Sequence, residues 1–120
     1  MARILYVEDF PDNAELVRKV LSARGHEVLL APDAETGLQM ATSQQPDLIL
    51  LDLGLPDADG QTLAGWLRQT PALAAIPIVA VTAWPEETAA RMVKVYGCNG
   101  YISKPINVAK FAAQVAAYLP

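Results

Sequence analysis

Three acidic residues follow two of the apolar runs in the sequence. Glu8 and Asp9 come directly after the run 4–7, and Asp52 follows the run 48–51. If both runs are neighbouring parallel strands, the three carboxylates converge at one edge of a sheet. Carboxylates this close cannot all remain charged without a partner, and Mg²⁺ is a suitable one because it prefers oxygen ligands. Acids in these places can also simply cap the helices that follow, but that alternative does not explain why all three fall here.

A hydroxyl group and an ammonium group follow two further apolar runs. Thr82 comes after the run 76–81, and Lys104 follows the run 100–103. Taken alone, Thr82 fits as a β-branched strand residue and Lys104 as a surface charge. Their positions at strand ends favour a shared site with the acids. Carboxylates, a hydroxyl group and a lysine around a cation suit an anion, and a phosphoryl group is the anion we expect.

The elements that must position these side chains alternate regularly along the chain. Strands are expected at 4–7, 28–30, 48–51, 76–81 and 100–103, and helices at 11–24, 33–44, 60–69, 86–96 and 107–119. The run 48–51 is too apolar for a half-exposed strand and fits a central parallel strand covered on both faces. The pattern predicts an α/β, flavodoxin-like (βα)5 fold, in which a doubly wound parallel five-stranded sheet has the strand order 2-1-3-4-5.

Length and charge restrict the classes of function. The chain has 120 residues, with nine Lys plus Arg against thirteen Asp plus Glu, which gives a net charge of −4. We expect one domain over 1–120 and no output domain. An acidic chain without a basic run is a poor nucleic-acid binder, and no apolar run is long enough for a transmembrane helix. A single cysteine, Cys98, excludes an internal disulfide and fits the reducing cytoplasm.

Four motifs in this order resemble the receiver domains of two-component response regulators, the CheY-like superfamily. They are Tyr6-Val7-Glu8-Asp9, Leu50-Leu51-Asp52-Leu53-Gly54-Leu55-Pro56-Asp57-Ala58-Asp59-Gly60, Val81-Thr82-Ala83 and Gly100-Tyr101-Ile102-Ser103-Lys104-Pro105. The resemblance extends from end to end of the chain. The segment 97–106 and Trp66 particularly resemble the single-domain DivK-type regulators.

The resemblance implies a role for each acidic residue. Asp52 would be the phosphoacceptor, which takes its phosphoryl group from the phosphohistidine of a sensor histidine kinase or a histidine phosphotransfer protein. Mg²⁺ would be bound by Glu8, Asp9 and Asp52 together with the backbone carbonyl of Gly54. The chain would then be a signalling protein rather than an enzyme, catalysing only its own phosphorylation and slow autodephosphorylation.

The resemblance also implies a switch. Lys104 would contact the phosphoryl oxygens, and the Lys104–Pro105 peptide bond is expected to be cis. Thr82 would turn its hydroxyl group to the phosphoryl group, and Tyr101 would change rotamer with it. This change would alter a surface that contacts a downstream protein target. That surface is made by the helix at 86–96, the strand at 100–103 and the helix at 107–119. The domain would be a monomer or a weak dimer.

Apolar residues near the acids suggest a partner surface. Phe10, Pro11 and Ala14 would lie at the start of the helix 11–24, where receivers dock on the bundle that carries the phosphodonor histidine. Apolar and aromatic residues are typical of interface cores. Alternatively, Phe10 folds back on its own domain. Trp84 could likewise form an output contact or pack on its own loop.

Other classes of function fit the sequence less well. A haloacid dehalogenase phosphatase needs a second Asp two residues after its nucleophile, and that position is Gly54. An FMN module would have a hydroxyl-rich loop where Glu8 and Asp9 stand, and no nucleotide-binding glycine motif occurs. One alternative stays open. The chain could be a receiver-fold interaction module that acts without phosphorylation, or the excised receiver of a hybrid histidine kinase.

Two positions predict a long-lived phosphorylated state. In receiver domains, which the chain resembles, side chains two residues after the phosphoacceptor and two after the threonine influence how fast water attacks the acyl phosphate. Here these positions are Gly54, which has no side chain to position a water, and Trp84, which is bulky and apolar. We expect the Trp84→Glu variant to release phosphate several times faster than the wild type in Mg²⁺, because glutamate can hold that water. The rate of phosphate release from isolated phosphoprotein measures this. A wild type that decays as fast as the variant would contradict the prediction.

Overall fold

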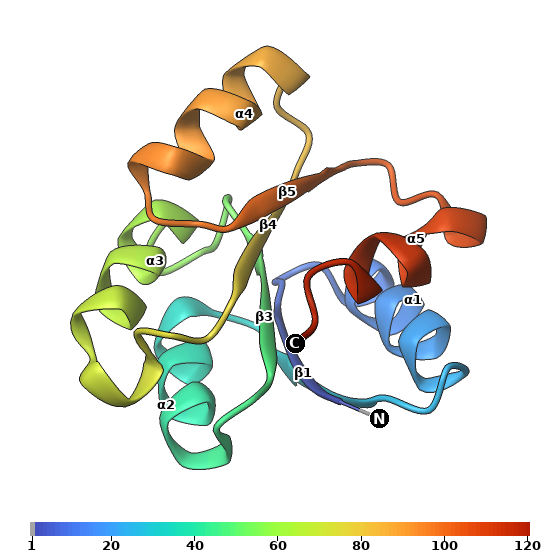
Figure 1. Cartoon of the computed structure of the whole chain (residues 1–120), viewed down its shortest axis with the longest axis horizontal. Helices are drawn as coiled ribbons and strands as arrows, with labels where there is room; N and C mark the ends of the chain where they lie inside the picture. The colour runs from blue at the N-terminus through green and yellow to red at the C-terminus, as the bar shows by residue number, and fades with distance from the viewer. Residues whose placement is uncertain (1) are drawn as a thin grey trace.

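A five-stranded parallel sheet forms the centre of the molecule in the computed structural model, which describes residues 2–120 (Figure 1). The strands are β1 (Arg3–Val7), β2 (Glu27–Ala31), β3 (Leu48–Asp52), β4 (Ile78–Thr82) and β5 (Gly100–Ser103). Their order in the sheet is β2-β1-β3-β4-β5, and every neighbouring pair is parallel. The predicted fold class and strand order are therefore confirmed.

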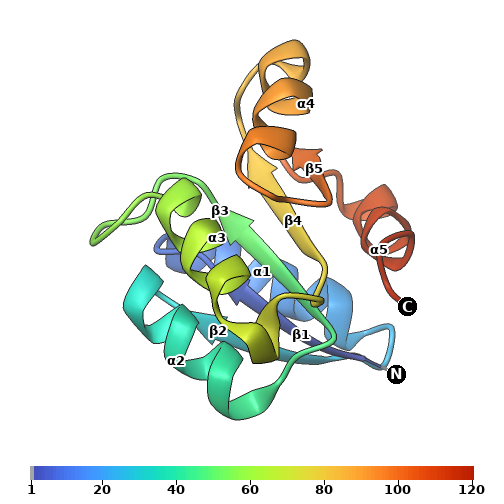
Figure 2. The ribbon, with the colours of Figure 1, turned by 60° about the vertical axis from the view of Figure 1, so that its left-hand side comes forward.

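Helices cover both faces of the sheet. They are α1 (Pro11–Ser22), α2 (Ala34–Gln44), α3 (Gly60–Gln69), α4 (Glu86–Val95) and α5 (Val108–Ala116), with a short 3₁₀ helix, η1, at Pro71–Leu73. Figure 2 shows α2 and α3 in front of the sheet and α1 behind it. Core contacts place α5 with α1, and α4 lies against β5 at the edge of the sheet (Figure 1). Within residues 2–120, none of these helices has the length and apolar character needed to cross a membrane.

Alternation along the strands divides the core into two layers. In β3, Leu48 and Leu50 pack with α1 and α5, whereas Ile49 and Leu51 pack with α2 and α3. Successive side chains of a strand point to opposite faces, and helices cover both faces of this sheet. All four side chains are therefore fully buried. The strand therefore needs an unbroken apolar run, and Asp52 is the position at which that run ends.

All expected bounds but one lie within two residues of those observed, and two of the differences have a clear physical cause. The strand expected from residue 76 begins at Ile78, because η1 and the turn after it occupy the preceding segment and Pro77 has no N–H to donate. The last helix ends at Ala116 rather than 119. Beyond it, the ring of Tyr118 lies directly over Gly100 at the start of β5, where a side chain on the glycine would collide with it. The periodicity that suggested a longer helix therefore reflects residues that continue to face the core after the helix has ended.

Gly60 allows α3 to approach the end of β3. A Cβ atom at Gly60 would lie 2.5 Å from the backbone oxygen of Asp52 and 2.7 Å from Cα of Leu53. The Gly60 N–H also donates to the Leu53 carbonyl at 3.0 Å. Because these neighbours are backbone atoms, a larger residue would displace the segment that carries Asp52.

We expect Gly60→Ala to lower the free energy of unfolding by about 1–3 kcal/mol, the usual cost of overpacking a close contact. Urea denaturation measures this change. The matched control is Gly65→Ala in the same helix, where an added Cβ meets no atom within 4 Å. That substitution should stabilise the protein by about 0.5–1 kcal/mol, because alanine favours the helix over glycine. Equal effects of the two substitutions would contradict the steric argument.

Candidate functional site

The three acids meet at the carboxyl ends of two adjacent strands. Strands β1 and β3 pair so that Val7 lies opposite Leu51, which brings the residues that follow to the same edge. One carboxylate oxygen from each of Glu8, Asp9 and Asp52 lies within 4.8 Å of the others. Glu8 and Asp52 are buried, with 4% and 8% of their surfaces exposed, whereas Asp9 is exposed. The cluster is therefore sunk into the molecule and open to solvent on the side of Asp9.

Lys104 brings its ammonium group to the two buried acids. Its Nζ atom lies 3.2 Å from Oε1 of Glu8 and 3.2 Å from Oδ1 of Asp52. The Lys104–Pro105 peptide bond is cis, as expected. The backbone N–H of Lys104 donates to the Thr82 carbonyl at 2.8 Å, which joins the end of β5 to that of β4. One ammonium balances only part of the charge of three carboxylates. The hard oxygen donors that remain suit a divalent cation such as Mg²⁺.

Burial and mutual repulsion separate the pKa values of the two buried acids. Burial and the neighbouring Glu8 raise the pKa of Asp52 from its ordinary 3.8 to about 6, and Lys104 opposes this rise. Burial also acts to raise the pKa of Glu8, but interactions with Asp52, Tyr6 and Lys104 outweigh it, so the pKa of Glu8 lies below its ordinary value. Burial acts to lower the pKa of Lys104, yet the two carboxylates hold it above its usual range. The site therefore keeps Glu8 and Lys104 charged, and the proton is taken up most easily by Asp52.

Two further residues contact Glu8, and the sequence analysis did not select either of them. The hydroxyl group of Tyr6 donates to Oε1 of Glu8 at 2.8 Å, and Nδ2 of Asn13 donates to the same oxygen at 3.2 Å. Tyr6 stands among the aliphatic residues of the run 4–7 and is fully buried. A tyrosine two residues before a strand-end acid was the available signal, because a buried hydroxyl group requires a polar partner.

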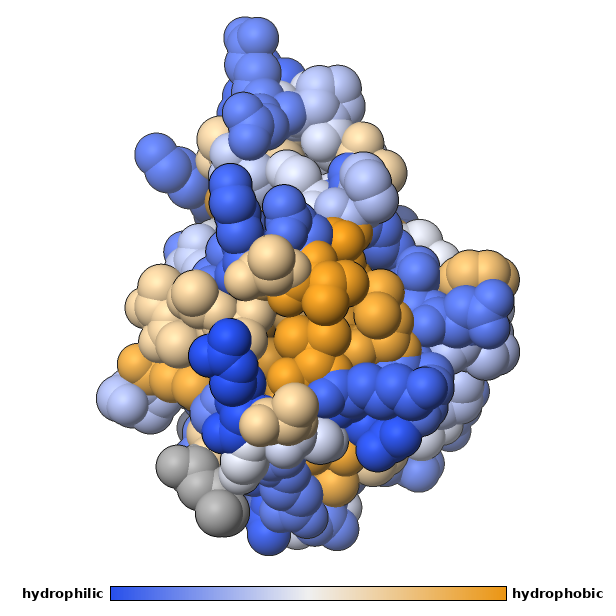
Figure 3. Space-filling view, turned by 90° about the vertical axis from the view of Figure 1, so that its right-hand side faces the viewer, coloured by the Kyte–Doolittle hydropathy of each residue, from blue (hydrophilic) through white to orange (hydrophobic). Residues whose placement is uncertain are grey.

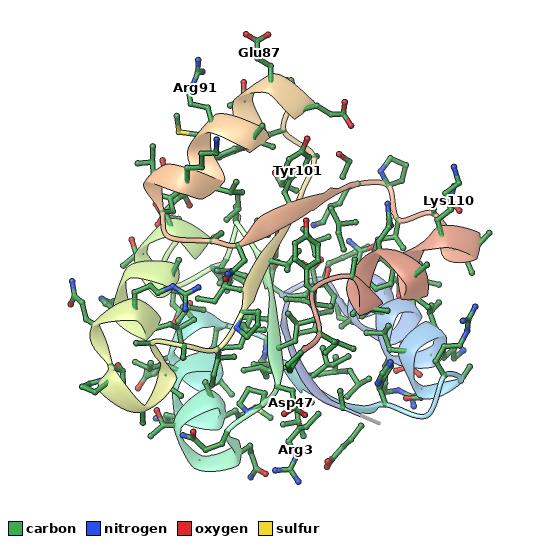
Figure 4. The ribbon with its side chains drawn as sticks, in the orientation of Figure 1. Arg3, Asp47, Glu87, Arg91, Tyr101 and Lys110 are labelled. Atoms are coloured by element: carbon green, nitrogen blue, oxygen red, sulfur yellow. The ribbon has the colours of Figure 1, made fainter. Side chains whose placement is uncertain are left out.

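Thr82 ends β4, and Tyr101 lies on the neighbouring strand β5. Thr82 is 3% exposed, and its hydroxyl oxygen accepts the backbone N–H of Trp84 at 3.0 Å. Trp84 and Tyr101, both half-buried, pack against a small cluster of Leu53, Ala80 and Val93. Figure 4 shows Tyr101 between β5 and α4. Trp84 therefore packs partly against the domain and keeps part of its surface exposed, so its output contact stays a prediction.

The loop between β3 and α3 is anchored at both ends. The N–H of Gly54 points to Oδ1 of Asp52 at 3.4 Å. The carboxylate of Asp57 accepts the backbone N–H groups of Ala34 and Glu35 at 2.8 and 3.0 Å, and so holds the loop against the start of α2. These two hydrogen bonds hold the pKa of Asp57 below its ordinary value. The two hydrogen bonds of Asp57 hold in place the loop in which the Gly54 carbonyl is expected to face the cation.

A groove of about 370 Å³ begins at Lys104 and passes beside α1. It is lined by Asn13, Leu16, Ala83, Lys104, Pro105 and Ile106. The face that carries α1 and α5 shows a broad hydrophobic area bordered by charged side chains (Figure 3). Phe10, the residue before α1, is 53% exposed and does not fold back into the core. The expectation that Ala14 belongs to this surface is corrected, because Ala14 is only 8% exposed and lies on the buried face of α1.

The fold and the site together define a class of protein. Acids, a hydroxyl group and a lysine gather at the switch point of a doubly wound parallel sheet, where such folds bind their ligands. The sequence matches the family described as the response regulator receiver domain over residues 4–116. The chain belongs to this family, and its role is that of a phosphoacceptor in two-component signalling.

Individual proteins similar to this chain are response regulators or receiver domains. The polar-differentiation response regulator DivK of Brucella anthropi is 35% identical over 116 residues, which cover 97% of this chain and 94% of that protein. The crystal structure of the chemotaxis response regulator CheY4 of Vibrio cholerae is 25% identical, covers 99% of both chains and gives a TM-score of 0.93. The receiver domain of a signal transduction histidine kinase from Syntrophus aciditrophicus is 28% identical, with a TM-score of 0.88 over 99% of this chain and 90% of that chain.

The raised pKa of Asp52 predicts that ionisation of this residue lowers the free energy of unfolding of the metal-free protein. Because the pKa rises from 3.8 to about 6 on folding, ionised Asp52 destabilises the folded state. The cost develops as the pH rises between these values and is complete above pH 6. We expect Asp52→Asn to raise the free energy of unfolding by about 1–3 kcal/mol at neutral pH. The gain should shrink as the pH falls toward 4, where the wild-type carboxyl group is protonated.

Urea denaturation with a chelator at several pH values measures this dependence. The control is Asp12→Asn, which makes the same change on an exposed turn of α1 and should alter stability by no more than about 0.5 kcal/mol. If Asp52→Asn were destabilising at neutral pH, the balance of burial, Glu8 and Lys104 described above would be wrong.

Proposed function

We propose that this chain is a phosphoacceptor response regulator in which Asp52 receives the phosphoryl group. The observation that carries the proposal is the pairing of a buried Asp52 carboxylate with the Lys104 ammonium 3.2 Å away, beside Glu8 and Asp9. An acceptor of this kind needs a nucleophilic oxygen, a cation site and a fixed positive charge in one place. A buried carboxylate, two further acids able to hold a cation, and an ammonium group lie near one another at the carboxyl ends of β1, β3 and β5, which supports the proposal.

The transfer needs no general base from the protein. An oxygen of ionised Asp52 forms a bond to phosphorus as the bond between phosphorus and the donor imidazole nitrogen breaks. The electron pair of the broken bond stays on the imidazole. Lys104 is placed to follow the phosphoryl oxygens, because its ammonium already contacts Oδ1 of Asp52. Mg²⁺, held by Glu8, Asp9, Asp52 and the Gly54 carbonyl, would neutralise charge on the transferring group.

The signal would leave the site through Thr82. Its hydroxyl group accepts the N–H of Trp84 in this state, so turning it toward a phosphoryl group alters the loop that precedes α4. Tyr101 packs in the same small cluster as Trp84 and would respond to the change. Four of the side chains labelled in Figure 4 lie on the proposed output surface of α4, β5 and α5, namely Glu87, Arg91, Tyr101 and Lys110. A target that binds this surface better in the phosphorylated state would shift the population toward it.

The phosphodonor would dock beside α1. Exposed Phe10 and the groove that ends at Lys104 offer an apolar surface next to Asp52, as an incoming phosphohistidine requires. The donor would be a sensor histidine kinase or a histidine phosphotransfer protein in the cytoplasm. Because the match covers 94% of the DivK regulator, that regulator has little length left for an output domain, and this favours a protein that signals by contact. The likeness to a kinase receiver keeps the hybrid-kinase alternative open. The domain itself would catalyse only its own phosphorylation and slow dephosphorylation.

Labelling with two kinds of phosphodonor tests both the acceptor and the docking surface. With a small-molecule phosphodonor and Mg²⁺, the wild type should be labelled and Asp52→Asn should not. With the fastest donor from a panel of autophosphorylated histidine kinases, Phe10→Ala should slow transfer by roughly fivefold, as the loss of a contact residue worth about 1 kcal/mol implies. The same Phe10→Ala protein should react normally with the small-molecule donor, because the acceptor site is intact.

The control for labelling is Asp47→Asn, which changes an aspartate at the opposite end of the sheet (Figure 4). The Asp47→Asn protein should be labelled to the same extent as the wild type. Absence of labelling in the wild type would favour an interaction module that works without phosphorylation. Equal slowing of Phe10→Ala with both donors would argue against a docking role for that residue.

A further inference from the structure

Tyr6 is a polar group in the middle of a hydrophobic layer. Its side chain is 0% exposed and packs among the apolar residues that β1 and β3 share with α1 and α5. A buried hydroxyl group without a hydrogen bond is unfavourable, because the hydrogen bonds it makes to water in the unfolded chain are not replaced. The hydroxyl group of Tyr6 avoids this cost by donating to Oε1 of Glu8 at 2.8 Å. The strand therefore carries a fixed donor from the core to an acid of the phosphorylation site.

The two oxygens of Glu8 have different surroundings. Oε1 accepts from the hydroxyl group of Tyr6 at 2.8 Å, from Nδ2 of Asn13 at 3.2 Å and from Nζ of Lys104 at 3.2 Å. Oε2 has one contact of this kind among the described residues, the backbone N–H of Phe10 at 3.5 Å. Protein donors thus occupy Oε1, and Oε2 is the oxygen that remains for a cation or for a water bound to one.

We propose that Tyr6 is a positioning residue for Mg²⁺, because its hydroxyl group holds Oε1 of Glu8 and so turns Oε2 toward the cation. This inference rests on the proposed function of the site. Tyr6 itself touches neither the cation nor the phosphoryl group. Its effect passes through the orientation of one carboxylate. The backbone at the end of β1 sets the positions of Tyr6 and Glu8, and the hydrogen bond sets the orientation of the Glu8 carboxylate.

Glu8 needs a donor of its own because Lys104 contacts two acids at once. Its ammonium contacts Glu8 and Asp52 equally, at 3.2 Å each. When Lys104 turns to phosphoryl oxygens on Asp52, Glu8 loses a donor. Tyr6 cannot follow, because its ring is locked in the core. Burial and the charge of Glu8 hold the pKa of Tyr6 far above its usual value, so the phenol keeps the proton it donates.

Tyr6→Phe tests the proposal, since it removes the hydroxyl group and keeps the ring. Titration calorimetry of the full chain with Mg²⁺ should give a dissociation constant that is about threefold or more higher than in the wild type, because a hydrogen bond to a charged acceptor is lost. Labelling by a small-molecule phosphodonor should be slower at low Mg²⁺ and should return to the wild-type rate at saturating Mg²⁺. A residue that only supports the core would not produce this recovery.

The matched control is Tyr118→Phe, the same chemical change beside Gly100 at the far end of β5. Its Mg²⁺ affinity should equal that of the wild type. If Tyr6→Phe raises the dissociation constant by less than threefold while thermal unfolding shows a folded protein, the positioning role is overturned and Tyr6 is a core residue only. If the wild type itself binds no Mg²⁺ and accepts no phosphoryl group, the proposed function fails, and this outcome is distinct from the failure of Tyr6 alone.

Discussion

The concentration of negative charge at the ends of β1 and β3 is the constraint on which the rest of the structure depends. Two carboxylates are buried and a third lies beside them, with one ammonium group to balance them. Such a cluster disfavours folding, because burial and mutual repulsion raise the free energy of ionised carboxylates, and a rigid surrounding structure is needed to keep them together. The sheet provides that rigidity, because every residue of β3 is buried and both faces are packed. The stability of the apolar core thus maintains a site that is electrostatically unfavourable when no cation is bound.

The same charge cluster is linked to both surfaces through which the domain would communicate. On one side, Lys104 belongs to the acidic site and to the groove beside α1. On the other side, Thr82 contacts the backbone of Trp84, which packs with Tyr101 near α4. A change of charge at Asp52 therefore meets groups that already belong to each surface. Short hydrogen-bonded connections of this kind can transmit a local electrostatic change without a large rearrangement of the sheet.

The sequence by itself determined the fold class and the core of the site. Unbroken apolar runs require strands that are covered on both faces, and their alternation with helical segments implies a parallel sheet. In such a sheet the residues after each strand lie at one edge, so Glu8, Asp9, Asp52, Thr82 and Lys104 could be grouped before any distance was known. The site was predictable because it depends on strand ends, which are the most sharply marked positions in the chain.

Only the tertiary structure decided how the side chains share their contacts. The sequence places Ala14 beside Phe10, but burial separates them, since one faces the core and the other faces solvent. Sequence spacing does not reveal that Tyr6 and Asn13 both reach the same oxygen of Glu8, or that Asp57 holds the start of α2. These contacts depend on side-chain direction and on packing between segments distant along the chain. Local patterns of hydrophobicity carry no information about either, so the orientation of Glu8 was settled by the folded structure alone.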